Sequence, residues 1–297
     1  MTILFSRRSA LSLFGATIAV ACTPPAESPG GGGTGAHDAI AAIERGLGGR
    51  VGVFALDTGS GRTVAFREDD RFAMCSTFKW VLCAAVLLRV DKGELALTDP
   101  VPYGRGDLLE YAPVTLEHVD SGSMTVEELA RAAITASDNT AANLLLGKVG
   151  GPGGLTRFVR QLGDTVTRLD RDEPQLNENL DGDERDTSSP KAMVGLMRAA
   201  LVGDALTAAS RERLLSWMRV SKSGQRRLRA GLPEGWSAGD KTGTGANGTT
   251  NNSMIATPPG GAPVLVAAFM SGSRVPGTTL EAAHANIARL VISALST

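Results

Sequence analysis

Strand-like sequence patterns occur only near the two ends of this 297-residue chain. Two lie near its start, joined by a turn rich in Gly and polar residues, and three lie near its end. They cover residues 50–56, 63–66, 237–244, 252–256 and 264–271. Strands are stable only when they pair into a sheet. We therefore expect one sheet that is assembled from both ends of the chain. The residues between the two groups of strands would form an insertion.

Helical periodicity fills most of the remaining chain. It covers residues 38–47, 76–92, 125–136, 140–149, 153–162, 189–201 and 280–295. The segment 76–92 is apolar on most faces, which predicts a helix that is buried nearly all round. The sequence thus predicts an α/β domain of residues 38–67 and 215–297, and an inserted helical domain of residues 68–214.

One long segment, residues 164–187, is polar, contains proline and lacks periodicity. A loop of that length inside a compact domain is usually functional. Clefts between two domains are also where ligand sites commonly form. The sequence therefore predicts a functional loop, and a site in the cleft between the two predicted domains.

The first 21 residues predict an export signal. Arg7 and Arg8 precede an apolar run at residues 10–21, which at about twelve residues is too short to span a bilayer. Paired arginines are typical of twin-arginine export, although a general secretory signal also fits. We expect an exported protein that is periplasmic, secreted or tethered to the outside of the cell membrane.

Two ways of processing this signal stay open. Ala19-Val20-Ala21 fits ordinary signal-peptidase cleavage, whereas Cys22 directly afterwards fits the modified cysteine of a bacterial lipoprotein. Residues 22–37, which hold three prolines and a run of glycines, predict a flexible linker. A linker directly after a cysteine favours the lipoprotein, and a lipid on Cys22 is the one membrane contact that we expect.

Charge, histidine and cysteine usage exclude several other functions. Thirty basic and 31 acidic side chains leave a net charge of −1, and no basic block indicates a nucleic-acid partner. His37, His118 and His284 lie far apart, without metal-ligand spacing, so we expect no metal and no cofactor. Cys75 and Cys83 would lie about 12 Å apart along a helix, too far for a disulfide, so we expect free thiols.

Ser76-Thr77-Phe78-Lys79 is the first of four polar clusters that follow one another along the chain. At positions i and i+3 of a helix, Ser76 and Lys79 share one face. A serine hydroxyl needs a base to become a good nucleophile, and a lysine can help once burial lowers its pKa. Taken alone, the cluster fits a plain N-cap before a buried helix better. The assignment therefore depends on the other clusters.

Ser137-Asp138-Asn139 falls between two predicted helices, where all three residue types are good helix caps. Beside an activated Ser76, the hydroxyl of Ser137 is a candidate proton relay to a leaving nitrogen. The amide of Asn139 is a candidate partner for a substrate carbonyl.

Lys241-Thr242-Gly243 lies in a predicted strand and is followed by Thr244. Because side chains alternate along a strand, Lys241 and Gly243 are expected to face one way, and Thr242 and Thr244 the other. Such a strand at the edge of a cleft would supply a cation and hydroxyl groups. The backbone N–H groups of Ser76 and Thr244 are the expected oxyanion donors.

Together with Glu173-Pro174-Gln175-Leu176-Asn177, these clusters resemble those of the class A serine β-lactamases, along nearly the whole mature chain. The resemblance implies a two-domain fold shared with penicillin-binding proteins. That fold has a mainly antiparallel sheet flanked by helices and an inserted all-helical domain. It also implies a monomer that opens the β-lactam ring of penicillins and cephalosporins through a serine acyl-enzyme, which gives antibiotic resistance.

The long loop is similar to the Ω-loop of that family. The resemblance implies that Glu173 is the base and Asn177 its partner, and that together they hold the water that hydrolyses the acyl-enzyme. It further implies an ion pair between Arg171 and Asp186 that closes the loop. The bond between Glu173 and Pro174 is a candidate cis peptide.

Substrate-binding residues are implied by weaker matches. Arg227 matches an arginine that would join Lys241, Thr242 and Thr244 in binding the carboxylate of a β-lactam. The alternative for Arg227 is a solvated surface side chain. Tyr111 matches an aromatic side chain at the rim of the site, and its alternative is a packing residue.

Departures from the family pattern bear on substrate range. Ala130 and Gly245 stand where some relatives carry a cysteine bonded to the position of Cys83 or Cys75, respectively. The second departure weakens a carbapenemase assignment, and Thr244 argues against a narrow penicillinase.

Three questions of mechanism and function stay open. Either Lys79 or Glu173 could be the base of acylation. A cell-wall D,D-peptidase is disfavoured by Glu173 and Asn177. A β-lactam sensor that acylates once usually needs a transmembrane segment or signalling domain, and the mature chain shows neither pattern.

Overall fold

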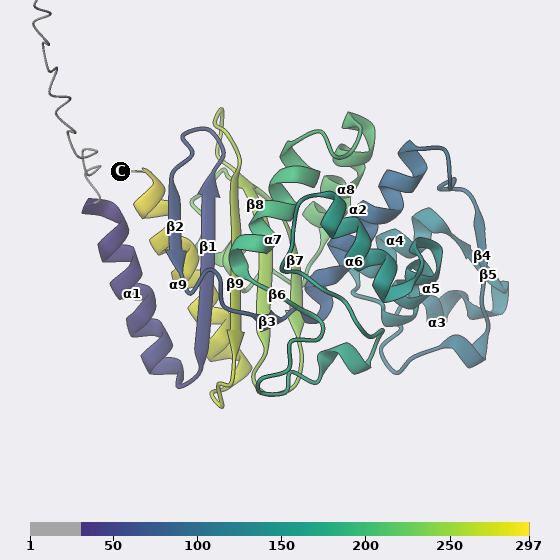
Figure 1. Cartoon of the computed structure of the whole chain (residues 1–297), viewed down its shortest axis with the longest axis horizontal. Coiled ribbons are helices and arrows are strands. Elements are labelled where there is room, and N and C mark those ends of the chain that lie inside the picture. Colours follow the sequence, from purple (N-terminus) through teal and green to yellow (C-terminus); the bar gives the residue numbers. More distant parts are fainter. Residues whose placement is uncertain (1–30, 297) are drawn as a thin grey trace, which may run out of the picture. The chain divides into compact units, whose positions relative to one another are not determined.

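The central sheet is built from both ends of the chain, as the strand patterns predict. The structure is a computed structural model that describes residues 31–296, with backbone alone for residues 31–34. The predicted export signal and Cys22 lie outside the described residues. Five strands follow one another in the order β2-β1-β9-β8-β7, and all neighbours are antiparallel (Figure 1). They are β1 (Arg50–Asp57), β2 (Thr63–Phe66), β7 (Ser237–Thr244), β8 (Thr250–Thr257) and β9 (Val264–Ser271).

The sheet is covered on both faces, which explains why β8 and β9 are buried almost throughout. Alternate residues of β9 enter two different cores. Val264, Val266, Ala268 and Met270 pack in the core formed with α1 (Gly31–Leu47) and α9 (Gly277–Ser296). Leu265, Ala267 and Phe269 belong to the core that contains α7 (Pro190–Met197) and α2 (Phe78–Asp91).

Helix α1 begins at Gly31, earlier than the predicted start at residue 38. Residues 31–37 are therefore helical, and predicting them as part of a flexible linker was wrong. The cause is packing: Ala36 and Ile40 are buried in the core, and the ring of His37 meets Phe66 of β2 edge-on at 5.0 Å. Tertiary contacts of an apolar helix face outweigh the low helix propensity of glycine.

The inserted residues form mainly helices, with two small sheets. Within the described residues the elements are β3 (Phe72–Ala73), β4 (Pro100–Pro102), α3 (Thr115–His118), β5 (Ser123–Thr125), α4 (Val126–Thr135), α5 (Asn139–Val149), α6 (Gly151–Gln161), β6 (Thr187–Ser188) and α8 (Ala208–Val220). In α2, every residue from Phe78 to Leu87 is buried, as the sequence predicted. That burial fixes the helix that follows Ser76.

Helix α8 is not among the helices predicted from the sequence. Its buried positions Leu214, Trp217 and Met218 have helical spacing, but they lie in a segment rich in arginine. The helix spans the predicted boundary at 214/215, and the division into two domains stays a prediction. Among residues 31–296, no helix has the length and apolarity that crossing a membrane would need.

Both described cysteines are buried free thiols, as predicted. Burial raises the pKa of each, Cys75 and Cys83, to about 12, so neither is a thiolate at neutral pH. The thiol of Cys83 donates to the carbonyl oxygen of Ala130 at 3.6 Å. The two residues are therefore neighbours, and the absence of a cysteine at position 130 is what leaves Cys83 unpaired.

Candidate active site

Ser76 lies in a 3-10 turn, Cys75–Thr77, directly before α2. Strand β8 holds the two residues before this turn, because the side-chain amide of Asn251 donates to the carbonyl oxygens of Ala73 at 2.7 Å and Met74 at 3.2 Å. Cys75 has φ of 45°, a left-handed conformation that is uncommon outside glycine. Such strained positions cluster at functional sites. The turn presents Ser76 directly before a helix whose residues from Phe78 to Leu87 are buried in the core.

Lys79 links the polar clusters of the sequence. Its side chain is fully buried, and Nζ donates to the carbonyl oxygen of Ser137 at 2.7 Å and to Oδ1 of Asn139 at 2.5 Å. It also lies 3.0 Å from Oε1 of Glu173. Burial lowers the pKa of Lys79, and the carboxylate of Glu173 acts in the opposite direction. An ammonium has three donors, and three close acceptors surround it here.

Glu173 contacts Ser76, Lys79 and Asn177 with its carboxylate. It is 2% exposed, and its Oε1 accepts from Oγ of Ser76 at 3.5 Å. Its Oε2 accepts from the side-chain amide of Asn177 at 2.5 Å. The peptide bond to Pro174 is cis, as predicted. A water between Glu173 and Asn177 would therefore meet a base and an amide at the same edge of the cleft.

The sequence analysis missed the residue that fixes Glu173 from the helical side. Asn143 of α5 accepts from the backbone N–H of Glu173 at 3.0 Å and donates to its carbonyl oxygen at 2.9 Å. Asn143 follows Asn139 by one helical turn, so the two side chains share a face. That spacing was the only sequence signal that could have identified it.

The hydroxyl of Ser137 lies between two buried lysines. Its Oγ accepts from Nζ of Lys241 at 3.0 Å and from Nζ of Lys79 at 3.4 Å. Ser137 has φ of 58°, again left-handed. Burial, and next the charge of Lys79, lower the pKa of Lys241 to about 7. With both neighbours donating to its oxygen, the hydroxyl of Ser137 keeps its own proton for a third partner.

Arg227 is buried behind strand β7. It is 7% exposed, so the alternative of a solvated surface arginine is wrong. Nη2 donates to Oγ1 of Thr244 at 2.7 Å, and Nη1 donates to the carbonyl oxygen of Gly243 at 2.9 Å. Burial lowers the pKa of Arg227, although an arginine side chain stays charged at neutral pH. The arginine therefore adds positive charge behind the hydroxyl of Thr244.

These side chains surround a cavity of about 380 Å³. Its lining comprises Ser76, Tyr111, Ser137, Asn139, Asn177, Ser223, Arg227, Thr242 and Thr244. Tyr111 is 56% exposed, so it lies at the rim and is not a packing residue. Ser223, which accepts from Oγ1 of Thr242 at 2.8 Å, is a lining residue that the sequence analysis missed.

Strand β7 presents opposite sides to the cavity and to the turn that bears Ser76. Thr242 and Thr244 line the cavity, whereas Lys241 is fully buried beneath it. A Cβ atom at Gly243 would come within 2.6 Å of the carbonyl oxygen of Met74. Glycine is therefore required where the strand passes the turn. The alternation that the sequence predicted agrees with this arrangement.

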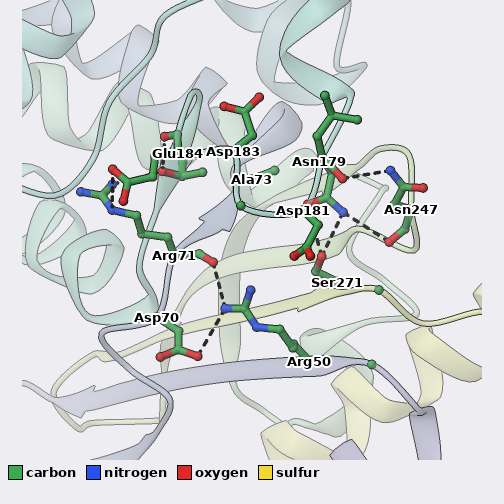
Figure 2. Close-up of a pocket in the computed structure, with 15 residues that line it drawn as sticks. Arg50, Asp70, Arg71, Ala73, Asn179, Asp181, Asp183, Glu184, Asn247 and Ser271 are labelled. Atoms are coloured by element: carbon green, nitrogen blue, oxygen red, sulfur yellow. Dashed lines mark hydrogen bonds and ion pairs between the residues drawn. The ribbon is translucent and has the colours of Figure 1, made fainter.

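A larger cavity, of about 750 Å³, lies beneath the long loop and contains none of these residues (Figure 2). Size alone does not identify a site, and the smaller cavity is the one lined by Ser76 and by Ser137, whose hydroxyl contacts two buried lysines with lowered pKa. Within residues 31–296, no cluster of three or more His, Cys, Asp or Glu side chains is arranged to hold a metal ion.

The long loop is closed by the predicted ion pair. Nε of Arg171 lies 2.6 Å from Oδ2 of Asp186, which is fully buried. Oδ1 of Asp186 accepts from the backbone N–H groups of Asp170 and Arg171 at 2.7 and 2.9 Å. The carboxylate thus joins the two ends of the loop that carries Glu173.

Comparison with known proteins agrees with this site. Residues 35–295 match the model of the β-lactamase enzyme family. The chain is 43% identical to the carbapenem-hydrolysing β-lactamase KPC of Klebsiella oxytoca, over 86% of this chain and 87% of that one. It is 46% identical to β-lactamase AST-1 of Nocardia asteroides, over 86% and 82%. A solved structure of the class A β-lactamase of the last common ancestor of Gram-negative bacteria is 52% identical with a TM-score of 0.86, over 88% of this chain and 99% of that one.

Proposed function

The chain belongs to the class A serine β-lactamases and hydrolyses β-lactam rings, which gives antibiotic resistance, and we propose how its own residues perform the two halves of this reaction. Oγ of Ser76 attacks the lactam carbonyl carbon, and the backbone N–H groups of Ser76 and Thr244 stabilise the oxyanion. The observation that carries the proposal is one buried carboxylate, Glu173, shared by Ser76, Lys79 and Asn177.

Glu173 is the proposed base of acylation. Oγ of Ser76 donates to Glu173, whereas the three close partners of Lys79 are all acceptors. That arrangement favours an ammonium at Lys79, which has no lone pair to accept the proton of Ser76. The hydroxyl proton therefore passes to Glu173 as the bond to the carbonyl carbon forms.

Ser137 protonates the leaving nitrogen. As the lactam C–N bond breaks, the proton of Ser137 moves to the nitrogen, and Ser137 regains a proton from Lys79 at 3.4 Å. Lys79 in turn regains one from Glu173 at 3.0 Å. The relay returns Glu173 to the carboxylate form, which is the form that the second half-reaction needs.

Deacylation uses a water held between Glu173 and Asn177. Glu173 takes a proton from this water while the oxygen of the water attacks the ester carbon, and the ester C–O bond then breaks. The released oxygen of Ser76 recovers the proton. Asn177 donates to Oε2 of Glu173 and so fixes the orientation of the carboxylate that activates the water.

Substrate binding is assigned to the side chains that line the cavity. Oδ1 of Asn139 is occupied by Lys79, which leaves its Nδ2 to donate to an amide carbonyl of the substrate. Thr242 and Thr244 bind the carboxylate, while Lys241, beneath the cavity, and Arg227, behind the strand, attract it by their positive charges.

Penicillins and cephalosporins are the proposed substrates. The relative KPC is named for carbapenem hydrolysis. In this chain a Cβ atom at Gly245 would lie 2.5 Å from Sγ of Cys75. The two positions are therefore neighbours, but they lack the disulfide whose absence weakens a carbapenemase assignment. We do not extend the proposal to carbapenems.

Export and attachment of a lipid at Cys22 are part of the proposal, with the enzyme acting as a monomer. The support is the sequence of residues 1–37, with its paired arginines, short apolar run and following cysteine. Incorporation of radiolabelled palmitate that disappears in Cys22→Ala would support the lipoprotein, and a labelled Cys22→Ala would contradict it.

The test of the mechanism is hydrolysis of a chromogenic cephalosporin by the purified protein, beside Ser76→Ala and Glu173→Ala. The wild type should turn over many times and Ser76→Ala should form no adduct. Glu173→Ala should form an acyl-enzyme slowly and keep it, since Lys79, freed from the carboxylate that raises its pKa, can replace the base of acylation only. A single stoichiometric burst from the wild type would instead indicate a penicillin-binding or sensor protein.

A further inference from the structure

The loop that carries Glu173 and Asn177 is not supported by packing along its whole length. Beyond Asn177 it runs over the cavity of about 750 Å³, with loop residues on one wall and strand ends, among them Arg50 and Ser271, on the other (Figure 2). Leu180 in this stretch is 51% exposed. An apolar core beneath the loop therefore does not fix its position here.

Two asparagines join this part of the loop to the turn between β7 and β8. The side-chain amide of Asn179 donates to the carbonyl oxygens of Ala246 and Asn247, both at 3.3 Å, and to Oγ of Ser271 at 2.9 Å. The amide of Asn247 donates in return to the carbonyl oxygens of Glu178 and Asn179, at 3.2 and 2.9 Å. Figure 2 shows the two side chains reaching toward one another across the cavity wall. We call this pair, Asn179 and Asn247, the amide clamp.

The backbone at both positions suits asparagine. Asn179 has φ of 46° and Asn247 has φ of 52°, in the left-handed region that asparagine visits more readily than most residues. The turn is itself anchored to the end of β9, because the N–H of Gly272 donates to the carbonyl oxygen of Asn247 at 2.8 Å. The amide clamp thus ties the loop to the sheet.

The amide clamp adjoins the residue that orients Glu173. The backbone N–H of Ala246, next to Asn247, donates to the carbonyl oxygen of Asn177 at 2.9 Å. The side chain of Asn177 then donates to Oε2 of Glu173. Movement of the loop away from the turn would therefore move Asn177, while Ser76 and Lys79 stay on α2 and the turn before it.

We infer that Asn179 and Asn247 are positioning residues for deacylation. They hold Asn177 where it orients Oε2 of Glu173, so that the water between the two side chains faces the ester of the acyl-enzyme. The inference rests on the proposed roles of Glu173 and Asn177. It predicts that loss of the amide clamp slows hydrolysis of the ester and leaves its formation unchanged, because Asn143 still holds the backbone of Glu173. No contact of the clamp reaches Ser76, Lys79 or Ser137 among the hydrogen bonds of the described residues.

The experiment removes the donors without forcing the backbone to change. Asn179→Asp and Asn247→Asp keep size and left-handed preference but add a charge. Asn179→Gly and Asn247→Gly add no charge but add flexibility. The matched controls are Leu180→Asp and Leu180→Gly, which make the same two changes at the adjacent residue of the cavity wall and remove no side-chain hydrogen bond.

We expect all four clamp variants to lower kcat about tenfold and to lower KM in parallel, so that kcat/KM for a chromogenic cephalosporin stays constant. The fraction of acyl-enzyme at steady state, measured by intact mass, should rise. A variant that merely folds less well would lower kcat without lowering KM. The Leu180 variants should match the wild type.

Besides normal deacylation in the clamp variants, two results would overturn the inference. One is equal slowing of deacylation in the Leu180 variants, since charge or flexibility would then be the cause. The other is a fall in kcat/KM with no rise in acyl-enzyme. Glu173→Ala separates the inference from its premise: if it fails to trap the acyl-enzyme, the proposed mechanism fails. If it traps the acyl-enzyme while clamp variants deacylate normally, only the role of the amide clamp fails.

Discussion

The two halves of the proposed reaction are supported in different ways. Lys79, Ser137 and Lys241 form the floor of the site, where both lysines are fully buried and stand on α2 and β7. Glu173 and Asn177 stand on the Ω-loop. That loop is held by the pair of Arg171 with Asp186, the amide clamp and Asn143, and part of it lies over a cavity.

The difference separates what core packing fixes from what polar contacts fix. Lys79 and Lys241 move only if α2 or the sheet moves, and both elements are packed in the core around these two residues. A loop residue moves when a few hydrogen bonds or one ion pair breaks, each of modest net value. Changes in the floor should therefore impair acylation. Changes in the loop should impair deacylation more than acylation, because Lys79 can replace Glu173 as the base of acylation only.

The largest expected effect comes from the floor. Lys79→Met keeps an unbranched side chain of similar length but removes the ammonium that contacts Ser137, Asn139 and Glu173. Because charged donors in dry sites contribute strongly to transition states, kcat/KM should fall about 1000-fold. Rapid-quench measurement of acylation checks this, with circular dichroism to establish folding. A folded variant that acylates within tenfold of the wild type would contradict the distinction between floor and loop.

The second effect comes from the loop. Asp186→Asn breaks the buried pair with Arg171, and loss of one partner of such a pair costs about 3 kcal/mol. We expect deacylation to slow about 100-fold and the melting temperature to fall. Acylation should slow much less, because Lys79 can replace Glu173 as the base of that step. Steady-state kcat and KM, with acyl-enzyme detected by mass, provide the measurement. An equal fall in kcat/KM would show that the loop supports both halves.

The third test uses pH and again concerns the floor. Burial lowers the pKa of Lys241 to about 7, so its positive charge is present below that pH and is lost above it. Since the charge attracts the substrate carboxylate in our proposal, kcat/KM should fall by up to about tenfold per pH unit above 7. In Lys241→Arg the fall should move to higher pH, because arginine stays protonated. An identical alkaline limb in both proteins would exclude Lys241 as its cause.

Sequence reasoning recovered the elements whose signals are local. The strands at both ends, the fully buried helix after Ser76 and the polar clusters all appear as short patterns, and β7 and β9 have the predicted bounds. The ion pair of Arg171 with Asp186 and the free thiols also agree. The resemblance to a family supplied the partners of Glu173, which spacing alone would not have given.

Features that depend on contacts between distant segments were not predictable. Asn143 and Ser223 belong to the site only because α5 and the segment before β7 fold against it. Asn179 and Asn247 lie 68 positions apart and meet only in the folded chain. Helix α1 extends to Gly31 because it packs on β2, which its glycine-rich sequence does not indicate. Tertiary packing decided each of these cases.

Gly245 lies between Cys75, in the turn before α2, and Asn177 of the loop. A substitution there should have the smallest effect on the rate and should show which of the two neighbours moves. A Cβ atom there would lie 2.5 Å from Sγ of Cys75, beside Ser76, and 2.8 Å from the carbonyl oxygen of Asn177. Both distances are too short for a real Cβ atom, so Gly245→Ala must displace the turn, the loop or both. Because the loop lies partly over a cavity whereas Cys75 is buried in the core, we expect the loop to yield.

The expected result for Gly245→Ala is a loss of about 2 kcal/mol in unfolding free energy, as for other overpacked sites, and an about threefold fall in kcat at constant kcat/KM. Cys75→Ala in the same chain removes the contact with Sγ but not the one with Asn177. The double variant should therefore regain part of the stability and none of the deacylation rate, which a double-mutant cycle by denaturant unfolding and kinetics would measure. Recovery of the rate together with stability would mean that the turn before α2 yields, and the floor would then be less rigid than its burial implies.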